Sequence, residues 1–359
     1  MSTPRTGDAP SGDLRGSPGT EPLVSVVVVN YNGGADVARS IAGLLADREG
    51  PESEILVVDN ASTDGSADQL ASLAEGEPAL RLLRSPTNRG YAGAVNVALP
   101  EARGRYLAVL NMDIAVTPGW LVPLTEVLEA DPDCGAVTPL ILLASDPGRI
   151  NAAGQNVHKT GLGFNRWLGK PRETAGSEPF LVTGVHGAAF VIRRELLERM
   201  GGWDETGFLY HEDVQLSWLL RLAGRGIRCV PASTVSHDYH LSMFPEKLFL
   251  LERNRAWMLA TNLHLPARLA LLPLRAVSEL MMWGYCLLRG PSFLRAKLRS
   301  YRWIAANRSR ARARRQFLDA VRSRSDWQLL RGLRWSYPID QFLTLGRERG
   351  PSRRDRIGR

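Results

Sequence analysis

The sequence predicts an α/β fold with a mostly parallel sheet flanked by helices. Short runs of aliphatic residues at 24–29, 54–58, 81–83 and 107–110 alternate with segments of helical periodicity. Runs that are apolar at consecutive positions are typical of parallel strands buried on both faces, and their alternation with helices is typical of βαβ units. Ligands of such sheets bind beyond the carboxyl ends of the strands, so we expect a site at that edge.

Polar residues follow each of the four predicted strands and are therefore candidates for that site. In chain order they are Asn30-Tyr31-Asn32, Asp59-Asn60, Asn88-Arg89-Gly90 and Asn111-Met112-Asp113. A carboxylate such as Asp113 at a strand end suits a divalent cation that binds a diphosphate, because Mg²⁺ and Mn²⁺ prefer oxygen ligands.

The helices and later strands follow in order. Apolar residues with helical spacing predict a helix around 37–45, turn and N-cap residues at 60–65 precede a second helix, and a third runs from Asn88 toward Leu99. Residues 181–194 indicate a strand, followed by a short helix to Met200 and a loop. Apolar residues spaced i, i+3, i+4, i+7 over 216–223 predict the next helix, so Glu212 and Asp213 lie in its first turn.

The charge of the chain is distributed unevenly. Its 359 residues, 44% of them hydrophobic, suffice for one large domain and an appendage. Residues 1–240 carry 20 Lys and Arg against 29 Asp and Glu, whereas residues 241–359 carry 25 against 8 and so a net charge of +17. We therefore expect a tail at 1–21 and a basic tail at 346–359, both disordered, an α/β domain at 22–240, and a basic amphipathic helical region at 241–345.

The basic helical region combines apolar stretches with arginines and with aromatic or methionine side chains, a pattern that favours docking on an anionic membrane surface. The residues concerned are Trp257, Met281, Met282, Trp283, Tyr285 and Trp303. Arg268, Arg275, Glu279 and Arg289 interrupt the apolar runs, so docking would be peripheral. The alternative is that these helices pack on the α/β domain or on a partner subunit.

The location of the protein is also predicted from the sequence. The N-terminus lacks the apolar segment of a signal peptide, and no uncharged apolar run is long enough to span a bilayer. Cys134, Cys229 and Cys286 are far apart and form no CxxC pair, which argues against a disulfide framework or a zinc cluster. We expect a cytoplasmic protein, peripheral at the inner face of the membrane.

Six segments together resemble the family 2 glycosyltransferases of GT-A fold, most closely their rhamnosyltransferase-like branch. In order they are VVVNYNG, VVDNASTDGS, NRGYAGAVN, LNMD, GGWDE and FLYHEDVQLSWLLR, within residues 24 to about 260. The resemblance implies a metal-dependent, inverting transfer of a sugar, possibly rhamnose, from a nucleoside-diphosphate donor. The acceptor would belong to cell-wall or surface-polysaccharide assembly and would be lipid-linked.

The resemblance also implies roles for individual residues. Asp113 and His237 would bind the divalent cation, and Asp213 would be the catalytic base with Glu212 in support. The donor site would comprise Asn30, Tyr31, Asp59, Asn60, Arg89, Gly90, Asn111 and Asp113, and the acceptor side Gly187 and Trp203. The chain departs from the family pattern at Asn111, which replaces the first acid of an Asp-x-Asp motif, and at Gln215, where many relatives carry an aspartate.

Structural interpretations of the same residues remain open. Asp113 could cap a loop, and Glu212 and Asp213 could complement a helix dipole. Arg89 could be a solvated surface charge, His237 a structural histidine and Trp203 ordinary core.

Two other classes of protein compete with the transferase. A nicotinamide-dependent oxidoreductase would need a Gly-x-Gly-x-x-Gly turn after the first strand, where NYNGG stands. A nucleic-acid-binding protein would explain the basic C-terminus, but the acidic first two thirds of the chain would repel phosphates.

Overall fold

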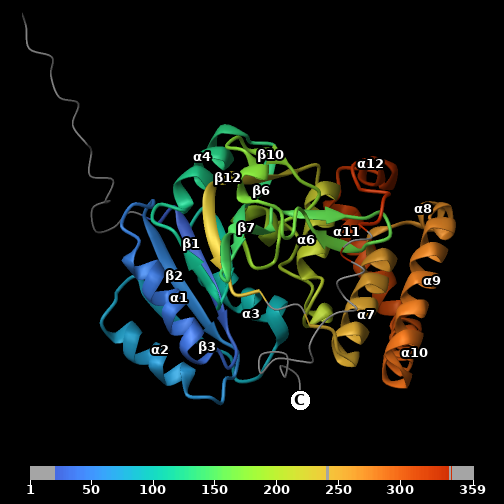
Figure 1. The fold of residues 1–359 in the computed structure, drawn as a ribbon, viewed down its shortest axis with the longest axis horizontal. Helices are drawn as coiled ribbons and strands as arrows, with labels where there is room; N and C mark the ends of the chain where they lie inside the picture. The colour runs from blue at the N-terminus through green and yellow to red at the C-terminus, as the bar shows by residue number, and fades with distance from the viewer. Residues whose placement is uncertain (1–20, 240–241, 339–340, 342–359) are drawn as a thin grey trace, which may run out of the picture.

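The computed structural model describes residues 21–239, 242–338 and 341, and Figure 1 shows a sheet with helices on both faces and a group of helices at one end. The tails predicted at 1–21 and 346–359 lie outside the described residues, except for Glu21.

One twisted sheet forms the centre of the N-terminal two thirds. Its parallel half has the order β3-β2-β1-β4, with β1 at Val24–Asn30, β2 at Ser53–Asp59, β3 at Leu80–Arg84 and β4 at Tyr106–Asn111. β11 (Ala189–Arg193) runs antiparallel between β4 and β6 (Cys134–Leu143), and β12 (Gly226–His237) pairs parallel to β6. The prediction of a mostly parallel α/β sheet is confirmed.

Alternate residues of β1 are buried on opposite faces of the sheet. Val24, Val26 and Val28 pack with the helices of one face, and Val27 and Val29 pack with the helices of the other. Burying a valine completely contributes about 1.5–3 kcal/mol, so this strand is held strongly from both sides. The helices are α1 (Gly34–Ala46), α2 (Ser66–Glu75), α3 (Gly90–Ala98), α4 (Leu121–Ala130), α5 (Arg194–Arg199) and α6 (Glu212–Leu222).

Short elements complete this part of the chain. They are the strands β5 (Ile114–Val116), β7 (Asp146–Ala152), β8 (Gln155–Val157), β9 (Gly163–Asn165) and β10 (Phe180–Leu181), and the 3-10 turns η1 (Leu99–Glu101), η2 (Arg172–Ala175) and η3 (Glu205–Gly207). β5 matters for the site because it pairs with the end of β12 and sets Ile114 opposite His237.

The basic helical region consists of α7 (Pro245–Asn262), α8 (Leu265–Ala270), α9 (Leu272–Arg289), α10 (Pro291–Ala306), α11 (Arg308–Val321) and α12 (Asp326–Arg331). Figure 1 shows these helices side by side at one end of the sheet. Within the described residues, no helix is both long and apolar enough to cross a membrane.

α7 packs on the catalytic part of the molecule. Met258 and Leu259 share a buried cluster with Val214 and Trp218 of α6. Trp257, which the sequence grouped with membrane-facing aromatics, is only 2% exposed, and its indole N–H donates to Asp204 at 2.7 Å. That expectation was wrong for Trp257, because α7 packs against the loop and helix that carry Glu212 and Asp213.

Candidate active site

A cavity of about 310 Å³ opens at the carboxyl ends of β1, β2 and β4. Six of the predicted site residues line it: Tyr31, Asn60, Gly90, Asn111, Asp113 and His237. We call it the donor cavity. The strand ends therefore meet at one edge of the sheet, as the fold class predicts.

Asp113 and His237 lie side by side in the donor cavity. Oδ1 of Asp113 lies 3.5 Å from Nε2 of His237, and both side chains are mostly buried. Nδ1 of His237 lies 2.9 Å from Oδ1 of the buried Asn151. An amide oxygen there can accept a proton from Nδ1, which would leave Nε2 able to bind a cation beside Asp113. Metal-binding histidines are commonly oriented by such a second hydrogen bond.

Asp113 and His237 fit a divalent cation whose remaining coordination positions are filled by the oxygens of a substrate. Among the described residues, no group of three His, Cys, Asp or Glu side chains is arranged to hold a metal ion. Hard cations such as Mg²⁺ are often bound through one or two protein ligands and the oxygens of substrate phosphates. Asp113 and His237 would therefore supply two ligands and leave the remaining positions to a diphosphate.

Asn30 and Asp59 lie beneath the donor cavity rather than in its lining. The Asn30 amide donates to Asp59 at 2.8 Å and to Ser66 at 2.9 Å, and both residues are buried. Asp59 also accepts from the backbone N–H of Ser62 at 3.3 Å. This network fixes the ends of β1 and β2 against the start of α2. Contact of Asn30 or Asp59 with a nucleotide stays a prediction.

The turn before α3 is held by Asn60 and requires a glycine. The Asn60 side chain accepts from Arg89 N and donates to Asn88. Gly90 has φ +71°, and a Cβ there would lie 1.9 Å from the carbonyl oxygen of Phe208. Arg89 forms an ion pair with Glu205 at 2.7 Å and is not among the residues that line the cavity, so its contact with the donor also stays a prediction.

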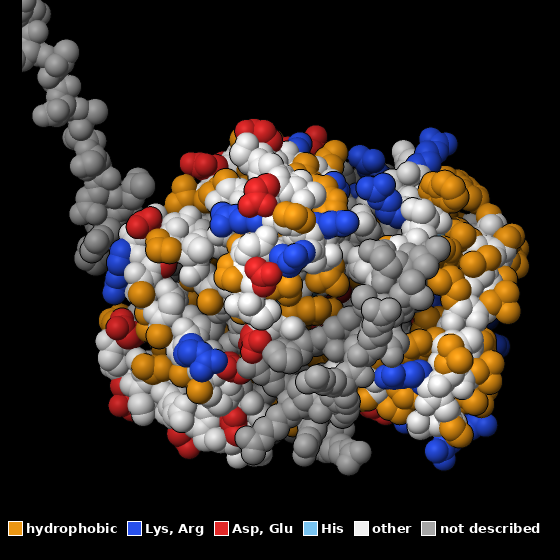
Figure 2. All heavy atoms as spheres, in the orientation of Figure 1, with side chains coloured by type: hydrophobic (Ala, Val, Ile, Leu, Met, Phe, Trp, Pro, Cys, Tyr) orange, Lys and Arg blue, Asp and Glu red, His pale blue; other side chains and the backbone are white. Residues whose placement is uncertain are grey.

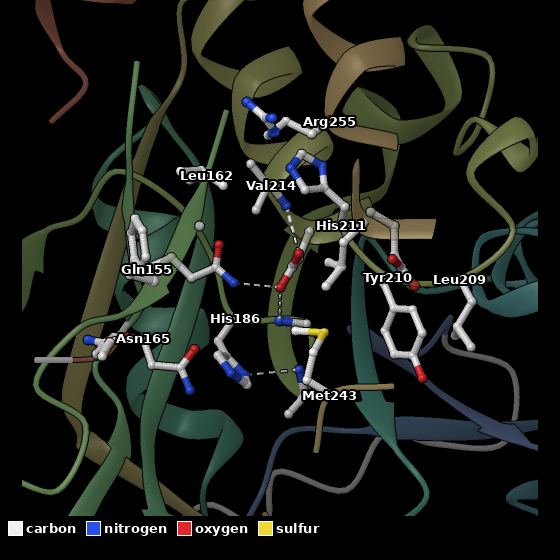
Figure 3. Close-up of a pocket in the computed structure, with 18 of the residues that line it drawn as sticks. Gln155, Leu162, Asn165, His186, Leu209, Tyr210, His211, Val214, Met243 and Arg255 are labelled. Carbon is white, nitrogen blue, oxygen red and sulfur yellow. Dashed lines mark hydrogen bonds between the residues drawn. The ribbon is translucent and has the colours of Figure 1, made fainter. Parts of the chain in front are cut away.

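A second cavity of about 420 Å³ adjoins the first. Glu212, Asp213, Gly187 and His186 line it together with apolar side chains of α7 and α9. Figure 3 shows part of this lining. We call it the acceptor cavity. Both cavities are lined by Tyr91, Asn111, Leu209, Tyr210 and Tyr239, so they are two parts of one cleft.

Asp213 is held in a fixed orientation inside the acceptor cavity. Oδ2 accepts from Gln155 at 2.7 Å and from Gly187 N at 2.9 Å, and Oδ1 accepts from Val214 N at 2.8 Å. Gly187 allows this approach, since a Cβ there would lie 3.0 Å from Oδ2. Burial raises the pKa of Asp213, while these donors oppose the shift.

Glu212 has a different environment although it is the neighbouring residue. Burial and then the charge of Asp213 raise its pKa to about 8. Its buried Oε2 has no hydrogen-bond partner among the described residues. At neutral pH Glu212 therefore holds a proton, whereas the three hydrogen-bond donors around Asp213 favour the charged form of that carboxyl group. Two acids whose environments differ in this way are typical of separate catalytic roles.

The loop before α6 has an uncommon backbone. Phe208, Tyr210 and His211 have positive φ angles of 60°, 67° and 75°. Residues other than glycine rarely adopt this conformation, and such strain gathers at functional sites. Nε2 of His211 contacts the Gly161 carbonyl at 2.7 Å, and burial lowers the pKa of His211 to about 4. A neutral His211 therefore anchors the loop without adding a charge beside Glu212.

The predicted acceptor role of Trp203 needs correction. The side chain is 3% exposed and packs between Tyr91 and Phe190, with ring centroids 5.8 Å and 5.7 Å away. It lines neither cavity, so it cannot stack on an acceptor in this conformation. The alternative interpretation, ordinary core, is the correct one, because the loop after α5 folds inward under α3.

Several lining residues were missed by the sequence analysis. Tyr91 separates the two cavities and donates from its hydroxyl to the Gly187 carbonyl at 3.2 Å. Burial, with Glu212, Asp213 and Asp113 nearby, raises its pKa well above the usual value. Gln155 and Asn151 orient Asp213 and His237. Tyr91 could have been found from its place in NRGYAGAVN, whereas Gln155 and Asn151 belong to a segment with no recognisable pattern.

Known proteins are similar to this chain in sequence and in fold. Residues 25–201 match the sequence profile of Glycosyl transferase family 2. The chain is 29% identical over 274 residues to N-acetylglucosaminyl-diphospho-decaprenol L-rhamnosyltransferase of Mycobacterium tuberculosis, covering 66% of this chain and 86% of that protein. It is 27% identical to beta-monoglucosyldiacylglycerol synthase of Nostoc sp., covering 59% of this chain and 44% of that protein.

A solved structure shares the fold. The crystal structure of GalNAc-T7 with UDP, GalNAc and Mn²⁺ aligns with a TM-score of 0.55 at 20% identity, over 68% of this chain and 48% of that one. The sheet order, the cleft at the strand ends and these relatives lead to one assignment: residues 25–201 form a glycosyltransferase domain of family 2, and the fold is GT-A.

Proposed function

We propose that this glycosyltransferase is an inverting, cation-dependent enzyme that moves a sugar from a nucleoside diphosphate to a lipid-linked glycan. The main support is the pairing of the two cavities. Asp113 and His237 lie in one, Asp213 lies in the other, and the cavities meet at Tyr91 and Asn111. A sugar bound across this junction would place its leaving diphosphate and its attacking acceptor on opposite sides.

On the donor side, Asp113 and His237 would hold a divalent cation, which when bound would stabilise the charge on the departing diphosphate. Tyr31 and Asn60 would contact the nucleotide from the ends of β1 and β2. Lys247 also lines this cavity and would add a positive charge close to the phosphates. The rigid network of Asn30 and Asp59 would keep these groups in place before the donor binds.

On the acceptor side, Asp213 would remove the proton from the attacking hydroxyl. A general base must be deprotonated at the working pH, and the hydrogen bonds from Gly187 and Gln155 favour the charged form of Asp213. Protonated Glu212 would not compete for this role and would instead donate a hydrogen bond to the acceptor. The fixed orientation of Asp213 would direct the attack toward the sugar at the junction.

The acceptor cavity also has a wall suited to a lipid-linked substrate. Its apolar lining includes Leu209, Met243, Leu248, Leu251 and Met282. The mycobacterial relative is named for a decaprenol-linked acceptor and the Nostoc relative for a diacylglycerol product. We extend to this chain the lipid character of those acceptors, and rhamnose as the first donor sugar to test.

Such an acceptor would bring the enzyme to a membrane. The net charge of +17 beyond residue 240 suits an anionic surface, where each basic residue contributes about 1 kcal/mol. Exposed leucines on α8 and α9, which Figure 2 shows as hydrophobic side chains at the edge of the molecule, would enter the interface. We place the enzyme peripherally at the inner face of the cell membrane.

A thermal-shift screen of nucleotide sugars with Mn²⁺ or Mg²⁺ tests the donor proposal. A ligand at a hundred times its dissociation constant stabilises the protein by about 2.7 kcal/mol. We expect one nucleoside-diphosphate sugar, dTDP-rhamnose first, to raise the melting temperature only when the cation is present, and Asp113→Asn to lose that cation dependence. If no nucleotide sugar stabilises the protein with either cation, the donor proposal is wrong.

A further inference from the structure

A third cavity lies within the basic helical region, and six of the residues that line it are arginines. It has a volume of about 320 Å³ and is enclosed by α7, α8, α9, α10 and α11. Its charged lining consists of Arg255, Arg268, Arg275, Arg308, Arg312, Arg315, Glu252 and Glu279. We call it the arginine pocket.

The two acids of the pocket are already neutralised. Glu252 pairs with Arg255 at 2.8 Å and with the fully buried Lys297. Glu279 pairs with the same two cations, at 2.8 Å from Arg255 and 2.7 Å from Lys297. These two acids and two bases balance one another, so the charges of the other five arginines remain uncompensated.

None of those five arginines forms a salt bridge with a carboxylate in the part of the chain that the structure describes. Arg315 donates only to the Leu263 carbonyl at 3.4 Å, and the buried Nε of Arg275 has no hydrogen-bond partner among the described residues. Burial and the neighbouring guanidinium groups of Arg315 and Arg275 lower the pKa of Arg268. Gathering these cations is therefore unfavourable unless an anion joins them.

Another cavity in the same molecule is also lined by arginines, but those arginines have partners. It lies beside the start of β1 and contains Arg103, Arg105, Arg193 and Arg194. Arg103 pairs with Glu54, Arg105 with Glu129 and Arg194 with Glu198. Arg193 donates to backbone carbonyls, including that of Cys134 at 3.0 Å. These arginines have structural partners, so an abundance of arginine alone does not explain the arginine pocket.

Exposed leucines accompany the arginine pocket. Leu265 and Leu269 flank Arg268 on α8, and Leu272 follows at the start of α9, all more than half exposed. Leu280 and Leu288 are 74% and 89% exposed further along α9. A site for a soluble anion gains nothing from such leucines, whereas a lipid presents a phosphate and a hydrocarbon chain together.

We propose that the arginine pocket binds the phosphate headgroup of a membrane lipid while the leucines of α8 and α9 enter the acyl boundary. Guanidinium groups bind phosphate oxygens in pairs of parallel hydrogen bonds, which five unpaired arginines can supply. The proposal deepens the membrane part of the proposed function and rests on it for the location of the enzyme. Unlike general attraction to a charged surface, it names a specific headgroup site.

The position of the pocket connects it to catalysis. Glu252 and Arg255 line both the arginine pocket and the acceptor cavity, so one buried ion pair separates the two. A headgroup held in the pocket would bring the bilayer surface next to the cavity in which Asp213 lies. A lipid-linked acceptor would then reach Asp213 without leaving the bilayer.

Co-sedimentation of the full-length chain with phosphatidylcholine vesicles, with and without phosphatidylglycerol, tests the pocket. The pocket variant is Arg268→Gln with Arg275→Gln. Its matched control is Arg295→Gln with Arg302→Gln, which removes two exposed arginines of α10 that do not line the pocket. Both variants lose the same charge. We expect the pocket variant to lose at least tenfold more affinity for phosphatidylglycerol vesicles than the control, and equal losses would overturn the proposal.

A soluble probe separates the headgroup from the bilayer. Inorganic pyrophosphate, with EDTA present, should raise the melting temperature of the wild type and of the control but not of the pocket variant. Leu269→Ser with Leu272→Ser should weaken vesicle binding and leave the pyrophosphate shift intact. If pyrophosphate distinguishes the variants but vesicles do not, the site serves a free phosphate and the lipid proposal is wrong.

A second pair of substitutions tests the proposal in case the Arg268→Gln, Arg275→Gln variant does not fold. Arg308 and Arg312 are exposed members of the pocket, so replacing both with Gln should not disturb buried packing. This variant should also bind phosphatidylglycerol vesicles less tightly than the control, and wild-type affinity in it would contradict the proposal. No readout involves turnover, so the pocket and the transferase function can fail independently.

Discussion

The donor and acceptor cavities are built in different ways. The donor cavity is lined largely by residues that follow directly after strands, such as Tyr31, Asn60 and Asp113. The acceptor cavity collects residues from α6, from the segment around Gln155 and Phe164, and from α7 and α9. The first depends on the local rule that parallel strands end at one edge, whereas the second depends on how distant segments pack. Substitutions should therefore separate donor binding from acceptor chemistry.

The two cavities also differ in the surroundings of their acidic side chains. Asp113 faces a histidine whose other ring nitrogen contacts an amide oxygen. Burial in the largely apolar acceptor cavity raises the pKa of both Asp213 and Glu212, and the charge of Asp213 raises the pKa of Glu212 further. A site of the first kind suits a cation and phosphates, and a site of the second kind suits proton transfer.

The largest effect should come from Asp213→Asn. An amide cannot take the acceptor proton, and a general base contributes about 10²–10⁴-fold to the rate. We expect transfer to fall by about 10³-fold while the donor dissociation constant changes by less than a few-fold. Steady-state kinetics and donor binding by calorimetry provide both measurements. If Glu212→Gln shows this behaviour and Asp213→Asn remains active, the roles of the two residues must be exchanged.

The next effect is on the donor side. Asp113→Asn removes one of the two protein groups that would hold the cation, so turnover should fall at least about a hundredfold with an intact fold. Unlike Asp213→Asn, it should also raise the concentration of Mn²⁺ needed for half-maximal activity. The matched control is Asp68→Asn, an exposed aspartate on α2. Unchanged turnover of Asp113→Asn at saturating Mn²⁺ would show that the assignment is wrong.

The sequence could predict the donor side better than the acceptor side, and the reason is physical. The run VSVVVV is apolar at nearly every position, so its strand and the place of Asn30 and Tyr31 follow from local pattern. The helical period of Leu216, Leu219 and Leu220 likewise predicted α6 and the position of Glu212 and Asp213 at its start.

Other features depend on contacts that no local pattern contains. Asp113 meets His237 because β5 pairs with the end of β12, which joins segments more than a hundred residues apart. The burial of Trp203 follows from the fold of the loop after α5 under α3, and that of Trp257 from its contacts with Asp204 and with Trp303 of α10. The ion pair of Arg89 with Glu205 is equally remote in sequence.

A smaller effect concerns Glu212 and pH. Its pKa is about 8 in the folded protein and near 4.5 when unfolded, so the folded state holds the proton more tightly. The resulting stability is present in full below pH 4.5 and is lost as the pH rises toward 8. Glu212→Gln has no carboxyl group at this position, so its unfolding free energy does not decrease in this way as the pH rises. Between pH 5 and 8.5, the variant should gain on the order of 4 kcal/mol of unfolding free energy relative to the wild type, since each pH unit in this window contributes about 1.4 kcal/mol.

Denaturant titrations of both proteins across this pH range measure that difference. Asp68→Asn again serves as the control, because it removes one carboxylate outside the two cavities. A constant difference between Glu212→Gln and wild type would show that Glu212 is ionised throughout the range, and Glu212 would then compete with Asp213 for the role of base.

The smallest effect should be a change in KM on substitution of Met282, which tests whether this residue contacts the lipid part of the acceptor or its sugar. Met282 of α9 lines the acceptor cavity, whereas its neighbour Met281 does not. Met282→Ser should raise KM for a lipid-linked acceptor about fivefold, since losing about 1 kcal/mol of apolar contact changes affinity by that factor. The turnover number and donor affinity should not change, and Met281→Ser should behave as wild type. Because a short water-soluble acceptor has no chain to touch α9, an equal rise in KM for that acceptor would show that Met282 contacts the glycan.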